Sequence, residues 1–320
     1  MARSLLHWHA WGVAWLAATL ITLPACDRTA TKANSMPSLQ SRLQPLRDVI
    51  YDDDAMFSGS RMSADLQALA PLAQQPGTPP EQVFLWHHAQ ASVYARRDMP
   101  EEAAEAAKRA LQMADPLPVL THSDERRFLR LSLARWLTDA QKLDEALQVA
   151  QALTRSLPLS PTACPPATVD QISPEQRLGA HEDLGYIQHE RGNYAQALQT
   201  NLALLGTARQ CIQAASLRPL ALRGVLNNIA QNHHAMGQLA EAEPYLLERL
   251  QITSDAKDEA SAFDTLFQLI VLSHERGEAA QANAWLERYE QRARVLNDAE
   301  HMAQAKTLRQ QVSQRRARGG

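Results

Sequence analysis

The sequence has little of what most other fold classes require. Aromatic residues make up 5% of its 320 residues, and it contains 12 glycines and 3 cysteines. Runs in which Val, Ile or Thr alternate with polar residues are nearly absent, which argues against a β-sheet. Phosphate loops, dinucleotide fingerprints and the G-x-S-x-G motif are also absent. The net charge of −3 argues against charge-driven binding of nucleic acid.

What the sequence does contain is a helix–turn–helix pattern that returns along the chain. The clearest copies turn at three glycines, Gly192, Gly237 and Gly277. Glycine ends a helix by adopting a left-handed conformation at no steric cost. The second helices of five copies share an alanine that allows close helix approach, and these alanines are Ala103, Ala146, Ala197, Ala242 and Ala282. A helix–turn–helix unit that recurs in this way along a chain predicts a stack of helix pairs.

The best copy, which runs from Leu184-Gly185 through Gly192 and Tyr194 to Ala197, resembles the tetratricopeptide repeat (TPR) family. The next copy, with Asn227-Asn228 before its turn, is similar to the longer repeats of kinesin light chains. The resemblance covers roughly residues 81–295. It implies an all-α, right-handed superhelical solenoid of antiparallel helix pairs. The first two copies are degenerate, because Asp98 and Gln141 stand at or near the place of the turn glycine.

These patterns divide the chain into five segments. They are a signal peptide at 1–25, a tether at 26–38, an N-terminal helical pair at 39–80, five repeats at 81–295, and a capping helix with a basic tail at 296–320. The N-terminal pair is predicted at 39–57 and 61–75, joined around Gly59. Thr78 is predicted to cap the next helix, and Ser173 to open a capping box after the proline-rich insertion at 158–174.

The N-terminus has the features of a secretory signal. A short apolar run follows Arg3 and ends in Leu23-Pro24-Ala25-Cys26. This end resembles a bacterial lipoprotein signal, which implies that Cys26 is acylated and anchors the chain to a membrane. The alternative is an uncleaved anchor, since residues 8–25 are just long enough to span a bilayer. Asp27 favours the inner membrane with the body facing the periplasm, if the enterobacterial rule applies.

The two remaining cysteines are Cys164, beyond the second helix of copy two, and Cys211, at the end of the second helix of copy three. Second-helix ends line one edge of such a stack, and an exported chain permits a disulfide. We therefore expect either a Cys164–Cys211 bridge or one buried and one loop thiol.

The TPR resemblance also implies which side chains face a ligand, because first helices line the concave surface in that family. In the fourth copy these positions hold Asn227, Asn228, Gln231 and His234. The same positions in the other copies hold Glu182, Asp183, Tyr186 and His189 in the third, Phe267, Gln268, Val271 and His274 in the fifth, and Arg135 in the second. We assign eight of them to the groove, namely Asn227, Asn228, Gln231, His234, Tyr186, His189, Phe267 and His274. Adjacent asparagines resemble the peptide-backbone clamps of kinesin-type repeats, since an amide both donates and accepts hydrogen bonds.

One position holds histidine in three successive copies, namely His189, His234 and His274. Residues aligned on parallel helices ~8–10 Å apart rarely converge on one ion at ~2 Å, so we predict no metal site. A pH-sensitive groove and ordinary surface histidines remain the alternatives.

The function predicted from these features is a membrane-tethered, exported TPR scaffold. It would bind an extended peptide or a partner helix in its groove, without cofactor, metal, nucleic acid or catalysis. One alternative is a helical envelope enzyme, for example a hydrolase acting on peptidoglycan. Another is a structural, self-associating repeat protein, and the oligomeric state stays open.

Overall fold

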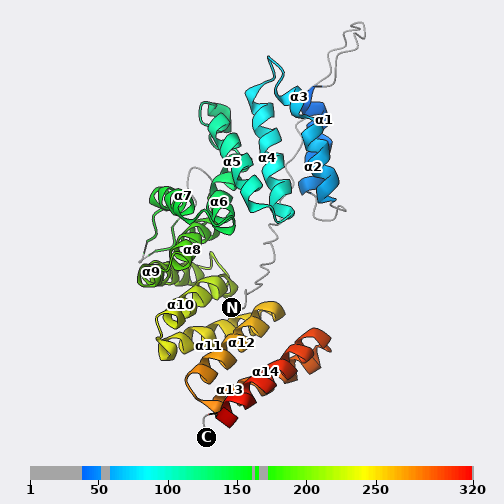
Figure 1. The fold of residues 1–320 in the computed structure, drawn as a ribbon. Coiled ribbons are helices and arrows are strands. Elements are labelled where there is room, and N and C mark those ends of the chain that lie inside the picture. Colours follow the sequence, from blue (N-terminus) through cyan, green and yellow to red (C-terminus); the bar gives the residue numbers. More distant parts are fainter. Residues whose placement is uncertain (1–37, 52–57, 161–162, 166–171, 319–320) are drawn as a thin grey trace. The chain divides into compact units, whose positions relative to one another are not determined.

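The protein is described here from a computed structural model that covers residues 38–51, 58–160, 163–165 and 172–318. Within these ranges every regular element is a helix. The helices follow one another in chain order as antiparallel pairs, which confirms the predicted all-α solenoid (Figure 1). Cys26 and Asp27 lie outside the described residues, as do the predicted signal peptide and nearly all of the tether.

Five successive helix pairs occupy the region of the predicted repeats. Their first and second helices are α4 (Pro80–Arg96) and α5 (Pro100–Ala114), α6 (Asp124–Asp139) and α7 (Leu143–Ser156), α8 (Pro174–Glu190) and α9 (Tyr194–Gln213), α10 (Arg223–Ala235) and α11 (Leu239–Asp255), and α12 (Glu259–Glu275) and α13 (Ala279–Val295). Short 3₁₀ helices, η1 (Pro118–Leu120) and η2 (Pro219–Leu222), precede α6 and α10.

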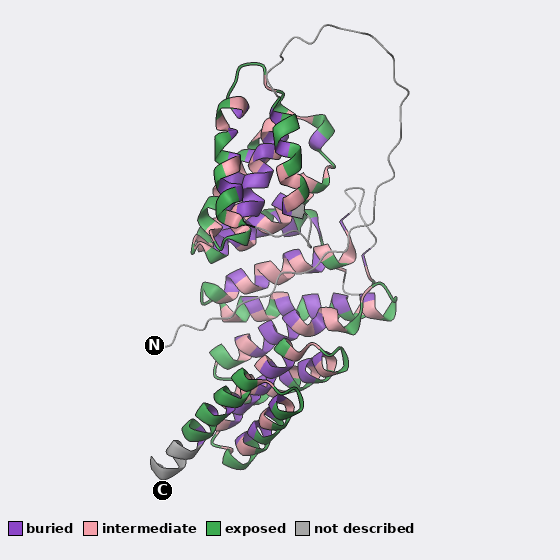
Figure 2. Ribbon diagram, turned by 90° about the vertical axis from the view of Figure 1, so that its right-hand side faces the viewer, coloured by how far each residue is buried: buried purple, intermediate pink, exposed green. Residues whose placement is uncertain are grey.

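The core lies between the helices, because each second helix packs against its own first helix and against the next one. The five repeated alanines are at most 1% exposed, and all of them lie at these contacts. Figure 2 shows the buried sides of the helices turned toward one another and the exposed sides turned outward. Burial of apolar side chains between neighbouring helices is therefore what holds the stack together.

The turn inside each pair has one backbone geometry throughout the stack. Gly192, Gly237 and Gly277 have φ values of +77°, +73° and +77°. Asp98 and Gln141 adopt the same left-handed conformation, with φ of +56° and +61°. In each turn the next residue donates a hydrogen bond to a carbonyl five residues earlier, as in a Schellman motif. The two degenerate copies thus keep the turn without its glycine.

The N-terminal segment differs in detail from the predicted pair. It contains three helices, α1 (Leu39–Tyr51), α2 (Gly59–Ala68) and the single turn α3 (Ala70–Ala73). Gly59 lies inside α2 rather than in a joint. Pro71 explains the extra break, because it has no N–H with which to continue α2.

The predicted cap at Thr78 is wrong, whereas the one at Ser173 is confirmed. Helix α4 begins at Pro80 without a side-chain cap, and the Thr78 hydroxyl instead donates to the carbonyl of Leu72, 2.7 Å away. At α8, Ser173 and Gln176 form both hydrogen bonds of a capping box.

The last helix, α14 (Ala299–Arg318), packs against α13. It buries Ala305, Leu308 and Val312 in the hydrophobic cluster of α11–α13. The chain remains helical through Arg318, so the predicted basic tail belongs to this helix as far as the structure describes it. None of the described helices combines the length and apolar composition that a membrane span requires.

Candidate functional site

The first helices of successive pairs touch one another, with α4 against α6, α6 against α8, and α8 against α10. We call the side of these helices on which the eight groove residues were predicted the first-helix surface. Asn227 and Asn228 are buried there, at 3% and 6% exposure, and His234 is exposed. The remaining five are half-buried, namely Tyr186, His189, Gln231, Phe267 and His274.

The asparagine pair on α10 retains unused hydrogen-bonding capacity. The Oδ1 atom of Asn227 accepts a hydrogen bond from Gln268 Nε2 on α12, at 2.9 Å. Neither the Nδ2 group of Asn227 nor the side-chain amide of Asn228 has a hydrogen-bond partner among the described residues. These groups are not among the buried polar atoms that lack a partner, so they reach solvent and are suited to bind a ligand's polar atoms.

Two histidines of the repeated column tie neighbouring first helices together. His189 Nδ1 lies 2.8 Å from Asn232 Oδ1, and His234 Nε2 lies 2.6 Å from a carboxylate oxygen of Glu275. Asn232 Nδ2 in turn donates to the backbone carbonyl of Asn228, which fixes the orientation of the amide. Each contact bridges two successive pairs, so these side chains position the surface. Among the described residues no group of three His, Cys, Asp or Glu is placed to hold a metal ion.

A cluster of charged side chains occupies the middle of the surface. Arg135 on α6 pairs with Asp183 on α8. Arg249 on α11 lies 2.8 Å from Asp264 of α12. Arg223 pairs more loosely with Asp258, at 3.6 Å. Each of the three arginines thus has an aspartate partner.

Glu182, one residue before Asp183, has no hydrogen bond or ion pair among the described residues. Burial raises its pKa to about 7, although the charge of Arg135 acts in the opposite direction. Its carboxylate lies over Gly224 of α10, where a Cβ atom would come within 2.0 Å of an Oε1. The sequence analysis named Glu182 as a ligand-facing position but did not predict its contact with α10, for which Gly224 was the available signal.

Tyr186 lies one turn after Glu182 on α8. The guanidinium carbon of Arg135 is 4.8 Å from the centroid of its ring, a cation–π distance. Burial raises the pKa of Tyr186 to about 12, with Glu190 adding negative charge nearby. The phenol is therefore neutral at physiological pH and is able to donate or accept a hydrogen bond.

Phe267 on α12 and His189 on α8 are less available for binding than their neighbours. Phe267 packs against the hydrophobic cluster of α11–α14, so much of its ring stabilises the fold. His189 also makes an edge contact with Tyr194, with ring centroids 5.0 Å apart. The accessible polar groups consequently concentrate on α8 and α10.

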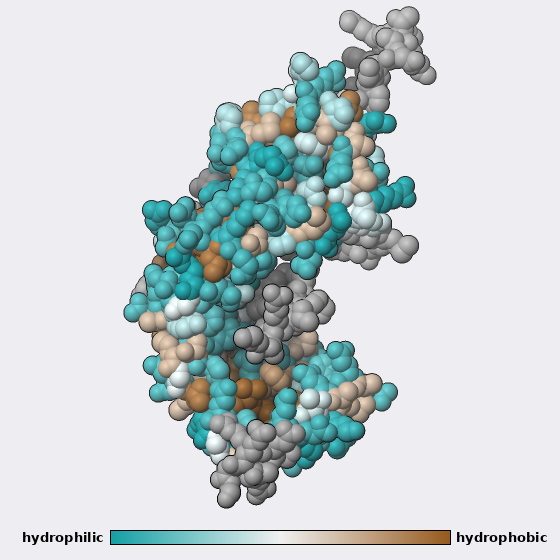
Figure 3. Space-filling view, viewed as in Figure 1, coloured by the Kyte–Doolittle hydropathy of each residue, from teal (hydrophilic) through white to brown (hydrophobic). Residues whose placement is uncertain are grey.

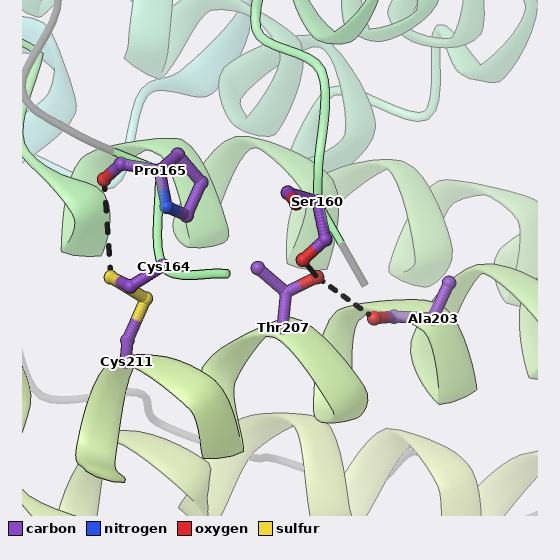
Figure 4. The surroundings of a disulfide bond; sticks show 6 residues. All are labelled: Ser160, Cys164, Pro165, Ala203, Thr207 and Cys211. Carbon is purple, nitrogen blue, oxygen red and sulfur yellow. Dashed lines mark hydrogen bonds between the residues drawn. A yellow bond between two sulfur atoms is a disulfide. The ribbon is translucent and has the colours of Figure 1, made fainter. Parts of the chain in front are cut away.

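The structure joins Cys164 and Cys211 by a disulfide (Figure 4). Beside it, the Thr207 hydroxyl lies 3.1 Å from the carbonyl of Ser160 and 3.2 Å from that of Ala203. The bridge and the Ser160 contact fasten the described part of the proline-rich insertion to α9. The insertion is thereby held against the same pair that carries Glu182.

The face of the molecule seen in Figure 3 is largely hydrophilic, and its apolar side chains form small separate patches. A polar surface of this kind favours recognition through hydrogen bonds and charge over burial of a large apolar partner.

Comparison with known proteins supports the fold. No protein-family model and no curated protein matches the sequence. Among solved structures, the apo form of RapI aligns with 84% of this chain and 69% of its own, at a TM-score of 0.63 and 14% identity. A Rap protein complexed with competence and sporulation factor aligns with 87% of this chain and 71% of its own, at a TM-score of 0.56 and 14% identity.

A putative kinesin light chain from Podosopora anserina, described by its nearly identical TPR-like repeats, aligns with 66% of this chain and 95% of its own. Its TM-score is 0.52 at 17% identity. At these identities the comparisons show the fold alone. They establish that the chain has a TPR-like helical repeat fold.

Proposed function

We propose that the protein is a scaffold that binds an extended peptide or partner helix on its first-helix surface. The observation that carries this proposal is the Asn227–Asn228 pair, which is buried yet has unused hydrogen-bonding groups. A solved neighbour of the same fold is complexed with competence and sporulation factor. That precedent supports ligand binding by this type of helix stack.

The direct test is crosslinking in cells followed by recovery of bound partners with the Asn228→Ala variant. Asn228 is preferable to Asn227, because Asn227 also bonds Gln268 and its loss would disturb α12. We expect capture to fall at least tenfold. Gln281→Ala, an exposed amide on α13, is the matched control and should capture normally. Equal capture by both variants would refute the assignment of this surface.

We further propose that the chain is exported and anchored through an acylated Cys26, with the repeats in the periplasm and the inner membrane favoured by Asp27. The disulfide supports this location, because bridges persist in oxidising compartments. Intact mass with and without globomycin tests acylation, and absence of a lipid-dependent shift would reject it. Recovery in the outer-membrane fraction would reject the inner-membrane assignment.

A further inference from the structure

In the charged cluster on the first-helix surface, as far as the structure describes it, the carboxylate of Glu182 is not part of an ion pair. Arg135, Arg223 and Arg249 face Glu182 from α6, α10 and α11, and each is already paired with an aspartate. Glu182 forms no ion pair among the described residues, although the charges of the three arginines act on it. Their attraction does not offset the cost of burying the carboxylate, so a ligand cation that pairs with it directly stabilises the ionised form.

Two residues of α10, Gly224 and Asn228, define the surroundings of Glu182. Gly224 lacks the side chain that would collide with the carboxylate. Asn228 lies four residues further along α10, so it follows Gly224 on the same side of the helix. The residue is 6% exposed, and its side-chain amide forms no hydrogen bond among the described residues. Its amide atoms are not among the buried polar atoms that lack a partner, so they reach solvent. The carboxylate of Glu182 and the side-chain amide of Asn228 are therefore neighbours, one able to pair with a cation and the other able to form hydrogen bonds.

We propose that this part of the surface, on α8 and α10, binds one cationic side chain of a peptide ligand, with Glu182 as the ion-pair acceptor and Asn228 as the neighbouring hydrogen-bonding group. The inference rests on the proposed function and adds the chemical class of ligand. Arginine fits best, because its planar guanidinium provides hydrogen bonds to a carboxylate and an amide at once.

Two pools of labelled heptapeptides, blocked at both ends, provide the test. One fixes arginine at the centre and the other fixes citrulline, a neutral analogue of the same shape, while the other positions are randomised. Fluorescence anisotropy with the full chain in detergent should show at least tenfold tighter binding of the arginine pool. The Glu182→Gln variant should lose this preference and still bind the citrulline pool. Glu287→Gln, an exposed carboxylate on α13, should behave as the native chain.

The pH dependence gives a second readout that a merely structural role would not produce. Cation binding requires the ionised carboxylate, so the arginine preference should rise about tenfold between pH 6 and pH 8 in the native chain. It should be flat in Glu182→Gln.

The outcomes separate the two proposals. Equal binding of both pools by the native chain overturns the cation site and leaves the peptide surface intact. Failure of both pools to bind overturns the peptide surface as well. A preference for arginine that survives Glu182→Gln places the acceptor elsewhere and also refutes the assignment.

Discussion

The first and third helix pairs reach the same geometry with different side chains. In the first pair, α4 and α5, Ala91 and Ala107 occupy the positions seven residues before and nine residues after the turn, and both are fully buried. In the third pair, α8 and α9, the equivalent residues are Gly185 and Asn201. Asn201 is also fully buried, but neither atom of its amide has a hydrogen-bond partner.

The difference shows that the third pair departs from the apolar packing of the first. Its two helices come into contact at Gly185, and they enclose the amide of Asn201. Burying that amide without a hydrogen bond lowers the stability of the fold by about 1–3 kcal/mol. The same pair carries the unpaired Glu182 and receives the disulfide. Concentration of unfavourable polar groups in one pair is typical of a functional region within a stable scaffold.

The largest expected effect comes from the disulfide, which the first pair lacks. Replacing Cys164 and Cys211 by alanine opens a loop of 47 residues and should lower the free energy of unfolding by about 2–4 kcal/mol. Urea denaturation measures the change. Reductant should destabilise the native chain by a similar amount and leave the variant unchanged. An identical midpoint for both proteins would show that the bridge does not stabilise the fold.

The glycine of the third pair should resist substitution. A Cβ at position 185 would lie 2.6 Å from Asn201 Oδ1, so Gly185→Ala should cost about 1–3 kcal/mol. Adding Asn201→Ala recreates the alanine contact of the first pair and should restore the stability. Gly206→Ala in α9 meets no atom within 4 Å and should gain about 0.5–1 kcal/mol. A double variant no better than Gly185→Ala alone would contradict this account.

Glu182 should make the stability of the third pair depend on pH. Its pKa is about 7 in the folded chain, against 4.5 as the ordinary value. A raised acidic pKa destabilises the folded state as pH increases from 4.5 to 7, and the penalty stays constant above that. Glu182→Gln should therefore be more stable than the native chain at pH 8, by an amount on the order of 1–3 kcal/mol, and equal to it at pH 4. Denaturation at both values measures this, and a difference independent of pH would argue against the assignment.

The smallest effect concerns the turns. Gly192→Ala places a Cβ on a backbone with φ of +77° and should cost about 1 kcal/mol. The reverse change in the first pair, Asp98→Gly, should gain a similar amount or less, because Asp98 already adopts φ of +56°. Thermal unfolding of the two variants compares them. Opposite signs are expected, and a loss in Asp98→Gly would indicate that its side chain stabilises the turn.

Much of the fold was predictable from residues that act locally. The turn glycines, the second-helix alanines and the Ser173 capping box gave the helix pairs correctly, because each depends on conformation or size over a few residues. Thr78 shows the limit of this reasoning, since its hydroxyl bonds the carbonyl of Leu72 instead of a helix end. Competition between two nearby hydrogen-bond partners is not readable from residue type.

The candidate surface was predictable only in part. The sequence predicted which helices form it and which residues lie on it, including Asn227, Asn228 and the histidine column. It did not show that His189 bonds Asn232 and His234 bonds Glu275, because those partners lie more than 40 residues away in the chain. It named Glu182 as a ligand-facing position but did not show that its carboxylate lacks an ion pair among the described residues, because that depends on how three arginines from other helices are already engaged.

By itself, the sequence determined the repeating helix pairs and their turns, because small residues and backbone conformation act within a single copy. Tertiary structure alone decided which polar groups are paired and which remain unpaired. Pairing depends on contacts between helices that the repeat spacing brings together but does not specify. For that reason the state of Asn201, Asn228 and Glu182, three polar groups without a hydrogen-bond partner among the described residues, became visible only in the packed third and fourth helix pairs.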